Sequence, residues 1–567
     1  MRHDALKATP TERWTIGVLA LIVALLSILP LVRLAMEAVL PGGRVDLGPA
    51  LGVLQARSTW IATGHTLATA SVGTLIAVLI GLTLALLVGL TDIRGRKALT
   101  FCALLPATIP PQVTALAWAQ LFGPASPLLN TLGLAPELGS PNPLYSAGGI
   151  MVLLGVQHAP LVFLSVRAGL RALPRDLVEA ARACGAGRGR VLATIILPVM
   201  TPPLVAGAAI AFVSAVGNFG IPALLGIPAG YTVLPTLIYQ RLAGFGPAII
   251  GETAVLSVIV GLVAFSGLAL QGLALRGRDY RLSGSGAALE PFRLGRWRGP
   301  VEALVVALML VMVAAPLVGL LATSLVSAYG VPLGPATATL GNYAEVLLRQ
   351  DMTIRAFRNS AALSLGAALL LSCLVVPLGV LLVWRKSRLL RLVSAAADIP
   401  YALPGIVLGI AAILLFLKPL PLLNFSLYNT IWIIFLAYLA RFLVLELRPV
   451  VAGVSQLDPA LDEAARMTGA GFLFRLRTIV LPLVAPMAAA GAILVFMTAF
   501  NELTVSALLW SAGNETLGVA VFNLDDAGRA PLAAALASVT VVVILAVMAL
   551  GSMLAPRLPK GALPWTD

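Results

Sequence analysis

Charged residues are scarce in this chain, and lysine is the scarcest of them. Only 11% of its 567 residues are Asp, Glu, Lys or Arg, whereas an ordinary soluble domain has about 25%. Hydrophobic residues make up 59%, and the mean hydropathy is +0.99. The chain therefore lacks the polar surface that a globule of this size needs in water. This composition excludes an ordinary soluble protein and predicts that most of the chain lies in lipid.

The chain also lacks a P-loop. That motif is a glycine-rich turn ending in Gly-Lys-Ser or Gly-Lys-Thr, which holds nucleotide phosphates. Five lysines occur, and none follows a glycine: Lys7, Lys97, Lys386, Lys418 and Lys560. The chain therefore does not bind ATP in the P-loop manner. We expect no catalytic residue and no bound cofactor.

Metal-binding side chains are few and dispersed. The three cysteines and the three histidines show neither metal-ligand spacing nor a disulfide framework; they are Cys102, Cys184, Cys373, His3, His65 and His158. No metal site is predicted. The net charge of +14 does not indicate nucleic-acid binding, because the basic residues form short clusters between long apolar runs, as in membrane proteins.

Twelve segments are long and apolar enough to cross a bilayer, since a helix needs about 20 residues for a core of roughly 30 Å. They lie near 14–37, 65–90, 98–122, 146–170, 200–224, 248–274, 300–325, 359–384, 392–416, 427–448, 482–509 and 531–555. Pro and Gly interrupt some of them, as at Ile109-Pro110-Pro111 and Ala402-Leu403-Pro404-Gly405. Such breaks fit either a pore or plain packing kinks.

Most of the 38 basic residues lie at the N-terminus, at the C-terminus or after every second span. The positive-inside rule therefore predicts that both termini are cytoplasmic. Arg441 lies inside the tenth span. Its long side chain is expected to reach back to the cytoplasmic interface.

The chain contains an internal repeat. The stretch from Glu179 to Gly187 recurs from Glu463 to Gly471, an offset of 284, and both copies continue to an Ile-x-Leu-Pro sequence. Each half has six spans, so both halves enter the membrane with the same orientation. The sequence therefore predicts an all-α integral membrane protein of two parallel six-helix repeats, 1–280 and 300–567. A cytoplasmic linker, 281–299, joins them.

The repeated loop lies between the fourth and fifth span of each half, on the positive side. A short helix through Glu-Ala-Ala should run into a glycine, where the chain turns at little steric cost. The small alanines allow another backbone to approach closely. The candidate docking residues are Glu179, Ala180, Ala181, Gly185, Glu463, Ala464, Ala465 and Gly469.

This pattern (Glu-Ala-Ala, three residues, Gly, nine residues, Ile-x-Leu-Pro) resembles the EAA loop of ABC importer permeases. In that family the loop forms coupling helices that sit in grooves on the nucleotide-binding subunits. The resemblance implies two copies of a separate ABC ATPase, which carry ATP and Mg. It also implies a periplasmic solute-binding protein, alternating access and the bacterial inner membrane.

The fused two-half layout resembles the ferric-iron permeases, with thiamine, aminoalkylphosphonate and polyamine permeases as alternatives. The resemblance includes the segments that begin at Asn218-Phe219 and at Phe500-Asn501-Glu502. Because polar residues in membrane spans are costly, Asn218, Phe219, Asn501 and Glu502 are candidates to line the pathway. The alternative is that they cap helix ends.

One alternative function, from another class of transporter, remains. An ion-coupled secondary transporter can also have twelve spans in two halves. It would not need two matched coupling loops, and its transport would not stop when ATP is depleted. A membrane-embedded enzyme would need a cluster of titratable residues at one depth, which the sequence does not show.

Overall fold

The computed structural model describes residues 9–41, 46–137, 139–244, 249–276, 291–385, 387–419 and 425–554. Within them the regular structure is helical, apart from two isolated β-bridges, Thr91–Phe292 and Val326–Ala338. The expected all-α fold is therefore confirmed. The first ten residues of the predicted linker 281–299 lie outside the described part of the chain.

The α-helices of the first half are α1 (Pro10–Val23), α2 (Leu29–Val39), α3 (Gly48–Gln55), α4 (Arg57–Leu90), α5 (Arg96–Thr108), α6 (Pro111–Phe122), α7 (Pro127–Thr131), α8 (Ala147–Arg171), α9 (Arg175–Ala183), α10 (Arg188–Val191), α11 (Leu197–Val199), α12 (Thr201–Val216), α13 (Leu234–Leu242) and α14 (Ile249–Ala274). Those of the second half are α15 (Arg298–Met309), α16 (Ala315–Ser324), α17 (Gly341–Ala344), α18 (Asp351–Arg385), α19 (Arg388–Ala402), α20 (Gly405–Phe416), α21 (Ile431–Ser455), α22 (Ala460–Met467), α23 (Phe472–Arg475), α24 (Leu481–Phe500), α25 (Ser506–Leu509), α26 (Leu517–Asp526) and α27 (Ala530–Leu554). Short π-helical segments link several of them, including α1 to α2 and α15 to α16.

Eight continuous helical segments in the described residues are long and apolar enough to span a membrane, or up to 11 if three bent pairs each count as one span. The continuous segments are 10–39, 57–90, 147–171, 249–274, 295–324, 351–385, 472–500 and 530–553. The tenth expected span corresponds to α21, which is long enough but carries Arg441, Glu446 and Arg448. A twelfth span therefore stays a prediction.

The Pro-Gly breaks bend the chain sharply. The pair α5 and α6 is bent by 102° after Thr108, and the pair α19 and α20 by 108° after Ala402. Both bends occur where Pro110 and Pro404 precede the second helix, because proline disfavours the helical conformation in the residue before it. The breaks predicted from the sequence are confirmed as sharp bends in the third and ninth expected spans.

Two expected spans end earlier than the sequence suggested. The fifth was expected to reach 224 and the eleventh 509, but α12 ends at Val216 and α24 at Phe500. Just beyond these ends, Asn218 accepts a hydrogen bond from the amide of Ile221, and Glu502 accepts one from that of Val505. Both contacts cap the start of the turn that follows, so a new helical segment begins beyond each span although apolar residues continue.

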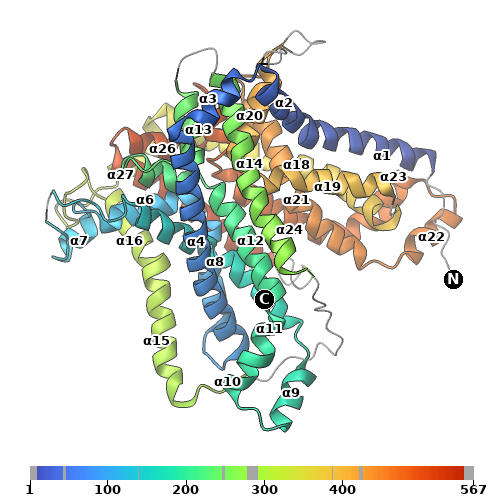
Figure 1. Ribbon diagram of the computed structural model, residues 1–567, viewed down its shortest axis with the longest axis horizontal. Helices are drawn as coiled ribbons and strands as arrows, with labels where there is room; N and C mark the ends of the chain where they lie inside the picture. The colour runs from blue at the N-terminus through green and yellow to red at the C-terminus, as the bar shows by residue number, and fades with distance from the viewer. Residues whose placement is uncertain are drawn as a thin grey trace.

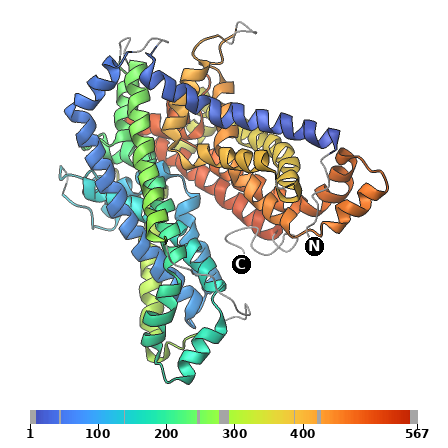
Figure 2. The same cartoon turned by 45° about the vertical axis from the view of Figure 1, so that its right-hand side comes forward.

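The helices form two arms that diverge from a common junction (Figure 2). In the first arm α4, α8 and α12 pack on one another; in the second, α18, α21 and α24 do the same. The residue ranges of α8 and α21 differ by the repeat offset of 284 at both ends. The repeat seen in the sequence is therefore a repeat of structure.

The first span of each half packs on the opposite half. Helix α1 lies along the second arm, against α18 and α19, and α2 packs on α20 (Figure 1). In return α16 packs on α6 of the first half. Each arm is therefore built from both halves of the chain, which makes the junction between the halves part of the fold.

Small residues let α4 and α8 approach closely. Gly73, Ala77, Gly81 and Ala85 are buried at four-residue intervals along α4, the small-xxx-small pattern of tightly packed membrane helices. A Cβ atom on Gly81 would lie 2.6 Å from the carbonyl oxygen of Ala159. This distance is too short for any side chain unless the helices separate.

We therefore expect Gly81→Ala to reduce the free energy of unfolding by about 1–3 kcal/mol, the usual cost of overpacking. The matched control is Gly64→Ala in the same helix, where a Cβ meets nothing within 4 Å. Thermal unfolding of the two variants in detergent checks this. Equal unfolding midpoints would contradict the packing argument.

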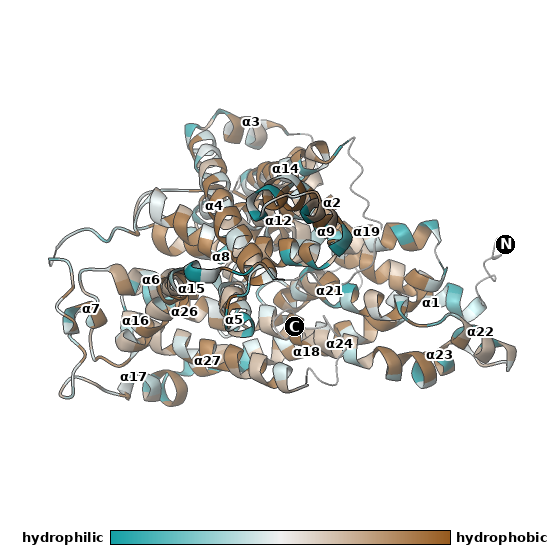
Figure 3. Cartoon of the chain, turned by 90° about the horizontal axis from the view of Figure 1, so that it is seen from below, coloured by the Kyte–Doolittle hydropathy of each residue, from teal (hydrophilic) through white to brown (hydrophobic). Residues whose placement is uncertain are grey.

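The outer surface of the long helices is largely apolar (Figure 3). Exposed leucines occur along both arms, among them Leu75, Leu79, Leu304, Leu310 and Leu369. Contiguous exposed apolar surface of this kind is costly in water. It is the surface expected of a protein that faces lipid on its sides.

Candidate functional site

The two Glu-Ala-Ala loops lie at the far ends of the two arms, α9 at one tip and α22 at the other (Figure 1). The elements that follow α9 and α22 correspond at the offset of 284. The ranges of α10 and α23 match residue for residue, as do the π-helical segments Leu192–Ile196 and Leu476–Val480. The two loops therefore share one local structure.

Each helix ends in a glycine with left-handed backbone geometry. The φ angle is +79° at Gly185 and +77° at Gly469. Beyond each glycine, an amide returns to a carbonyl of the last helical turn: Ala186 to Ala181 at 3.0 Å and Ala470 to Ala465 at 3.1 Å. This is the Schellman arrangement, which favours glycine because a side chain at positive φ is strained. The expectation that the chain turns at these glycines is confirmed.

One face of each short helix points outward. Glu179, Ala180, Glu463 and Ala464 are exposed, while Ala181 and Ala465 are half-buried. One leucine on each helix is also exposed at the same register, Leu177 in α9 and Leu461 in α22. An acidic, small-residue face with one leucine is thus presented twice, and each face is open for a partner.

A cavity of about 310 Å³ lies at the junction of the two halves. The first half lines it with the bend between α5 and α6, and the second half with α21, the end of α24 and the chain just beyond it. Its lining residues are Leu104, Ala107, Thr108, Ile109, Pro110, Pro111, Gln112, Leu164, Arg441, Leu494, Met497, Thr498, Asn501, Glu502, Leu503 and Thr504. Two of the four predicted pathway residues, Asn501 and Glu502, are among them.

The polar side chains of this cavity are held in place by specific contacts. Gln112 donates its side-chain amide to the backbone oxygen of Asn501 at 3.0 Å and to its side-chain oxygen at 3.3 Å, across the two halves. The Glu502 carboxylate accepts the amides of Val505 and Ser506 and the hydroxyl of Ser506, at 2.9–3.2 Å. Glu502 therefore both lines the cavity and caps a turn, which combines the two alternatives left open by the sequence.

The other two candidates do not line this cavity. Asn218 stands at the repeat position of Glu502 and caps the amide of Ile221 at 3.1 Å. Phe219 is fully buried in an aromatic cluster with Tyr239 and Phe522. In the structure Phe219 packs on Phe522 of the second half, and Asn218 fixes the turn that contains Phe219. The first half thus makes the same cap as the second with a neutral side chain.

Arg441 lies at the junction of the two halves, and its expected reach to the cytoplasmic interface stays a prediction. Its guanidinium lies over Gly405, where a Cβ atom would be 2.5 Å from Nη1, and it lines the junction cavity. Nη1 is buried and makes no hydrogen bond to the described residues. The bend before α20 and the missing side chain at Gly405 create the space that accommodates Arg441 beside the junction cavity.

Sequence reasoning also missed Gln112. The signal was available, because Gln112 is a polar residue in an apolar run and directly follows the Pro110-Pro111 break. A polar side chain at such a break is a functional candidate for the same reason as an ionisable one.

A second cavity, of about 300 Å³, lies on the side of the molecule away from the two loops. Its polar lining comes from Gln120, Tyr145, Tyr329, Asp525 and Asp526. Burial, together with the charge of Asp526, raises the pKa of Asp525 to about 6. Burial also raises the pKa of both phenols, with Asp525 adding to the effect. At neutral pH this cavity therefore holds carboxylate charge and neutral phenol oxygens.

Comparison with known families agrees with this architecture. The family model described as "Binding-protein-dependent transport system inner membrane component" matches residues 77–277 and 375–560. One permease domain therefore lies in each half, inside the predicted bounds 1–280 and 300–567. These outer bounds themselves stay predictions.

Relatives support the same assignment. The chain is 30% identical over 71% of its length to a probable ABC transporter permease of Sinorhizobium fredii and covers 70% of it. Two proteins named ferric transport system permeases, from Actinobacillus pleuropneumoniae and Haemophilus influenzae, are 26% and 25% identical. The alignments include 79% and 73% of this chain and 64% of each relative.

Among solved structures, a chain of a bacterial ABC transporter that imports the polysaccharide alginate aligns with 46% of this chain and 96% of its own. Its TM-score is 0.36 and its identity 18%, values too low to support an argument. The family model covers most of the described chain and matches it twice, once in each arm. The chain therefore belongs to the family of binding-protein-dependent transport system inner membrane components, a non-catalytic, multi-pass permease family whose members work with an ATPase and a solute-binding protein.

Proposed function

We propose that this chain is the permease subunit of an ATP-driven importer of ferric iron in the bacterial inner membrane, with both termini in the cytoplasm. The observation that carries the proposal is the pair of exposed helix–glycine loops, identical in local structure, at the tips of two divergent arms. One ATPase subunit docks at each loop and holds ATP and Mg. Closure of the ATPase pair drives the arms together and produces alternating access.

The junction cavity is the part of the pathway that this proposal assigns to the chain. Asn501 and Glu502, two of the candidate pathway residues, line it together with Gln112 and Arg441. Among the described residues that line this cavity, one acid and one base are charged, Glu502 and Arg441, so their charges balance there. A balanced cavity favours transient passage, because it holds neither a cation nor an anion strongly.

Ferric iron is favoured as the solute on two grounds. Relatives along most of the chain are named ferric transport permeases. In addition, the cavity away from the loops offers carboxylate and phenol oxygens, and hard oxygen ligands suit hard cations. A loaded binding protein would deliver the ion on that side. Thiamine, an aminoalkylphosphonate and a polyamine are the alternative solutes; an ion-coupled secondary transporter is the alternative of another class.

The test is uptake of labelled ferric iron, thiamine and 2-aminoethylphosphonate by cells with and without the chain, before and after ATP depletion. Iron uptake that needs both the chain and ATP supports the proposal. Chain-dependent uptake of another solute would refute the iron assignment and leave the importer intact. Uptake that persists without ATP but stops when ion gradients collapse would favour the secondary transporter.

A further inference from the structure

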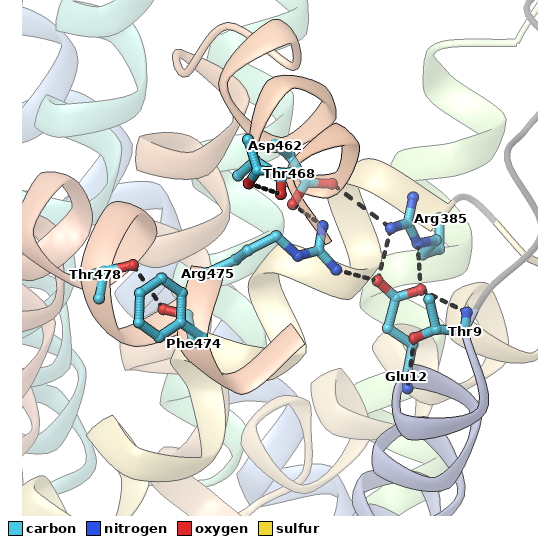
Figure 4. Close-up of polar contacts among 9 residues, drawn as sticks. Thr9, Glu12, Arg385, Asp462, Thr468, Phe474, Arg475 and Thr478 are labelled. Carbon is cyan, nitrogen blue, oxygen red and sulfur yellow. Dashed lines mark hydrogen bonds and ion pairs between the residues drawn. The ribbon is translucent and has the colours of Figure 1, made fainter. Parts of the chain in front are cut away.

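Four charged side chains form a buried network at the second loop (Figure 4). Glu12 of α1 binds Arg385, at the end of α18, through both of its oxygens at 2.8 and 3.1 Å. It also accepts a hydrogen bond from Arg475 of α23 at 2.8 Å. Arg475 in turn pairs with Asp462 of α22. The network therefore connects the second loop with two segments that are far apart from it in the sequence, the start of α1 and the end of α18.

The network is closed to solvent and balanced in charge. The side chain of Glu12 is 0% exposed, that of Arg475 2%, that of Asp462 8% and that of Arg385 12%. It contains two carboxylates and two guanidinium groups. Removing one member of such a network leaves an uncompensated buried charge, which is strongly unfavourable. The loop and α1 are therefore held together more firmly than by exposed ion pairs, which contribute little.

Glu12 also fixes the start of α1. Its carboxylate accepts the amide of Thr9 at 3.0 Å, while the Thr9 hydroxyl accepts the amide of Glu12 at 3.3 Å. This reciprocal capping box stabilises the first turn of the helix. The residue that completes the capping box of α1 is thus the same one that binds the second loop.

The first loop has no such network at the corresponding positions. Val178 and Val191 stand at the repeat positions of Asp462 and Arg475, and both are buried. Two exposed arginines of this loop contact the linker between the halves: Arg182 lies 4.8 Å from the centre of the Phe292 ring, and Arg188 donates to the carbonyl oxygen of Arg293. The two loops share one backbone structure but are therefore attached to the rest of the chain in different ways.

We propose that Glu12, Arg385, Asp462 and Arg475 are positioning residues that make α1 and the second loop one rigid unit, so that movement of α22 is transmitted along α1 and α2. Helix α2 packs on α20, and α20 begins at Gly405, against the Arg441 guanidinium that lines the junction cavity. The second loop thus has a mechanical route to the cavity through a helix of the first half. This inference rests on the proposed coupling function of the loops.

The first loop supplies the variant that tests this proposal. Asp462→Val with Arg475→Val installs the residues of the first loop and leaves Glu12 and Arg385 paired with each other, so no buried charge is left alone. We expect the variant to fold and to retain its ATPase subunit. Solute uptake and the stimulation of ATP hydrolysis by loaded binding protein should fall about tenfold, within the usual range of coupling between sites.

The matched control is Asp398→Val with Arg448→Val, which removes an exposed Asp–Arg pair of 2.5 Å from the same half. It should leave uptake and stimulation within about twofold of the wild type, since exposed pairs contribute little.

If loaded binding protein stimulates ATP hydrolysis as strongly with the Asp462→Val, Arg475→Val variant as with the wild type, the inference is overturned. Loss of ATPase binding in a folded network variant would also overturn it, because the network would then serve docking itself. Failure of the proposed function can be told apart from failure of this inference. In the former case the ATPase would not co-purify even with the wild-type chain.

A distance measurement keeps the inference testable if the network variant does not fold. Spin labels are placed on α1 at Trp14→Cys and on α22 at Met467→Cys, both exposed positions; a second sample pairs the exposed Cys184 of the first loop with Thr468→Cys. The remaining native cysteines are replaced. With ATP bound, the distance between the loops should shorten while the distance from α1 to α22 stays constant. Equal changes in both distances would refute the rigid unit.

Discussion

Reversing the charge of both loop glutamates, Glu179→Arg with Glu463→Arg, is expected to abolish ATPase co-purification and to reduce uptake by at least about tenfold. Both side chains are exposed, and each lies next to two alanines on the outward face of its helix. A long cation there blocks close approach of a partner backbone. It also inverts the charge that the partner meets, which costs several kcal/mol at an interface. Co-purification with a tagged ATPase and uptake assays measure the two effects.

The folded permease should be unchanged, because neither glutamate supports the core. Glu179 forms an ion pair with Arg175 of the same helix, and exposed pairs of this kind contribute about 0–1 kcal/mol. The control is Glu137→Arg, an exposed glutamate in the segment between α7 and α8. Normal ATPase binding by the double variant would show that the loops are not the docking sites.

Local sequence was sufficient to predict the repeat and the breaks. The matched stretches from Glu179 and from Glu463 form the same helix and glycine turn, because helix propensity and the glycine cap are properties of neighbouring residues. The bends before α6 and α20 follow from proline in the same way. These features need no information about partners distant in the chain.

The ends of the spans depended on more than apolar character. Residues beyond Val216 and Phe500 are still largely hydrophobic, so composition alone extended both spans too far. What the sequence did not reveal is the new turn that begins beyond each span, capped by Asn218 and Glu502, which becomes visible only with three-dimensional structure. Likewise, Arg441 is accommodated beside the junction cavity by the space at Gly405, a tertiary effect.

The buried network at the second loop was not predicted, since its four members come from three distant regions of the chain. The sequence held one signal that could have indicated it. Where the repeat aligns Val178 with Asp462 and Val191 with Arg475, two apolar positions have become charged with opposite signs. A compensated charge change at two buried positions of a repeat predicts an ion pair, although not its connection to Glu12.

Glu502→Gln is expected to reduce iron uptake by at least about 30-fold while ATPase binding remains normal. The substitution leaves Arg441 as the only charged side chain among the described residues that line the junction cavity. At an effective dielectric constant of 20, an uncompensated unit charge about 8 Å from a passing cation costs ~2 kcal/mol for each positive charge on that cation, and ~2 kcal/mol already corresponds to about 30-fold in rate. Labelled uptake in cells measures the loss, and co-purification shows that docking is intact.

Two further variants separate charge from capping. Glu502→Asn installs the residue that caps the equivalent turn of the first half, so a loss of uptake with this variant is due to charge. Glu502→Gln with Arg441→Gln restores neutrality and should recover most of the lost uptake, because the barrier comes from the uncompensated guanidinium. If Glu502→Gln leaves uptake unchanged, or if the double variant is no better than the single one, then Glu502 serves only as a cap. The pathway role would then be withdrawn, since the charge balance of the cavity would have no effect on what passes through it.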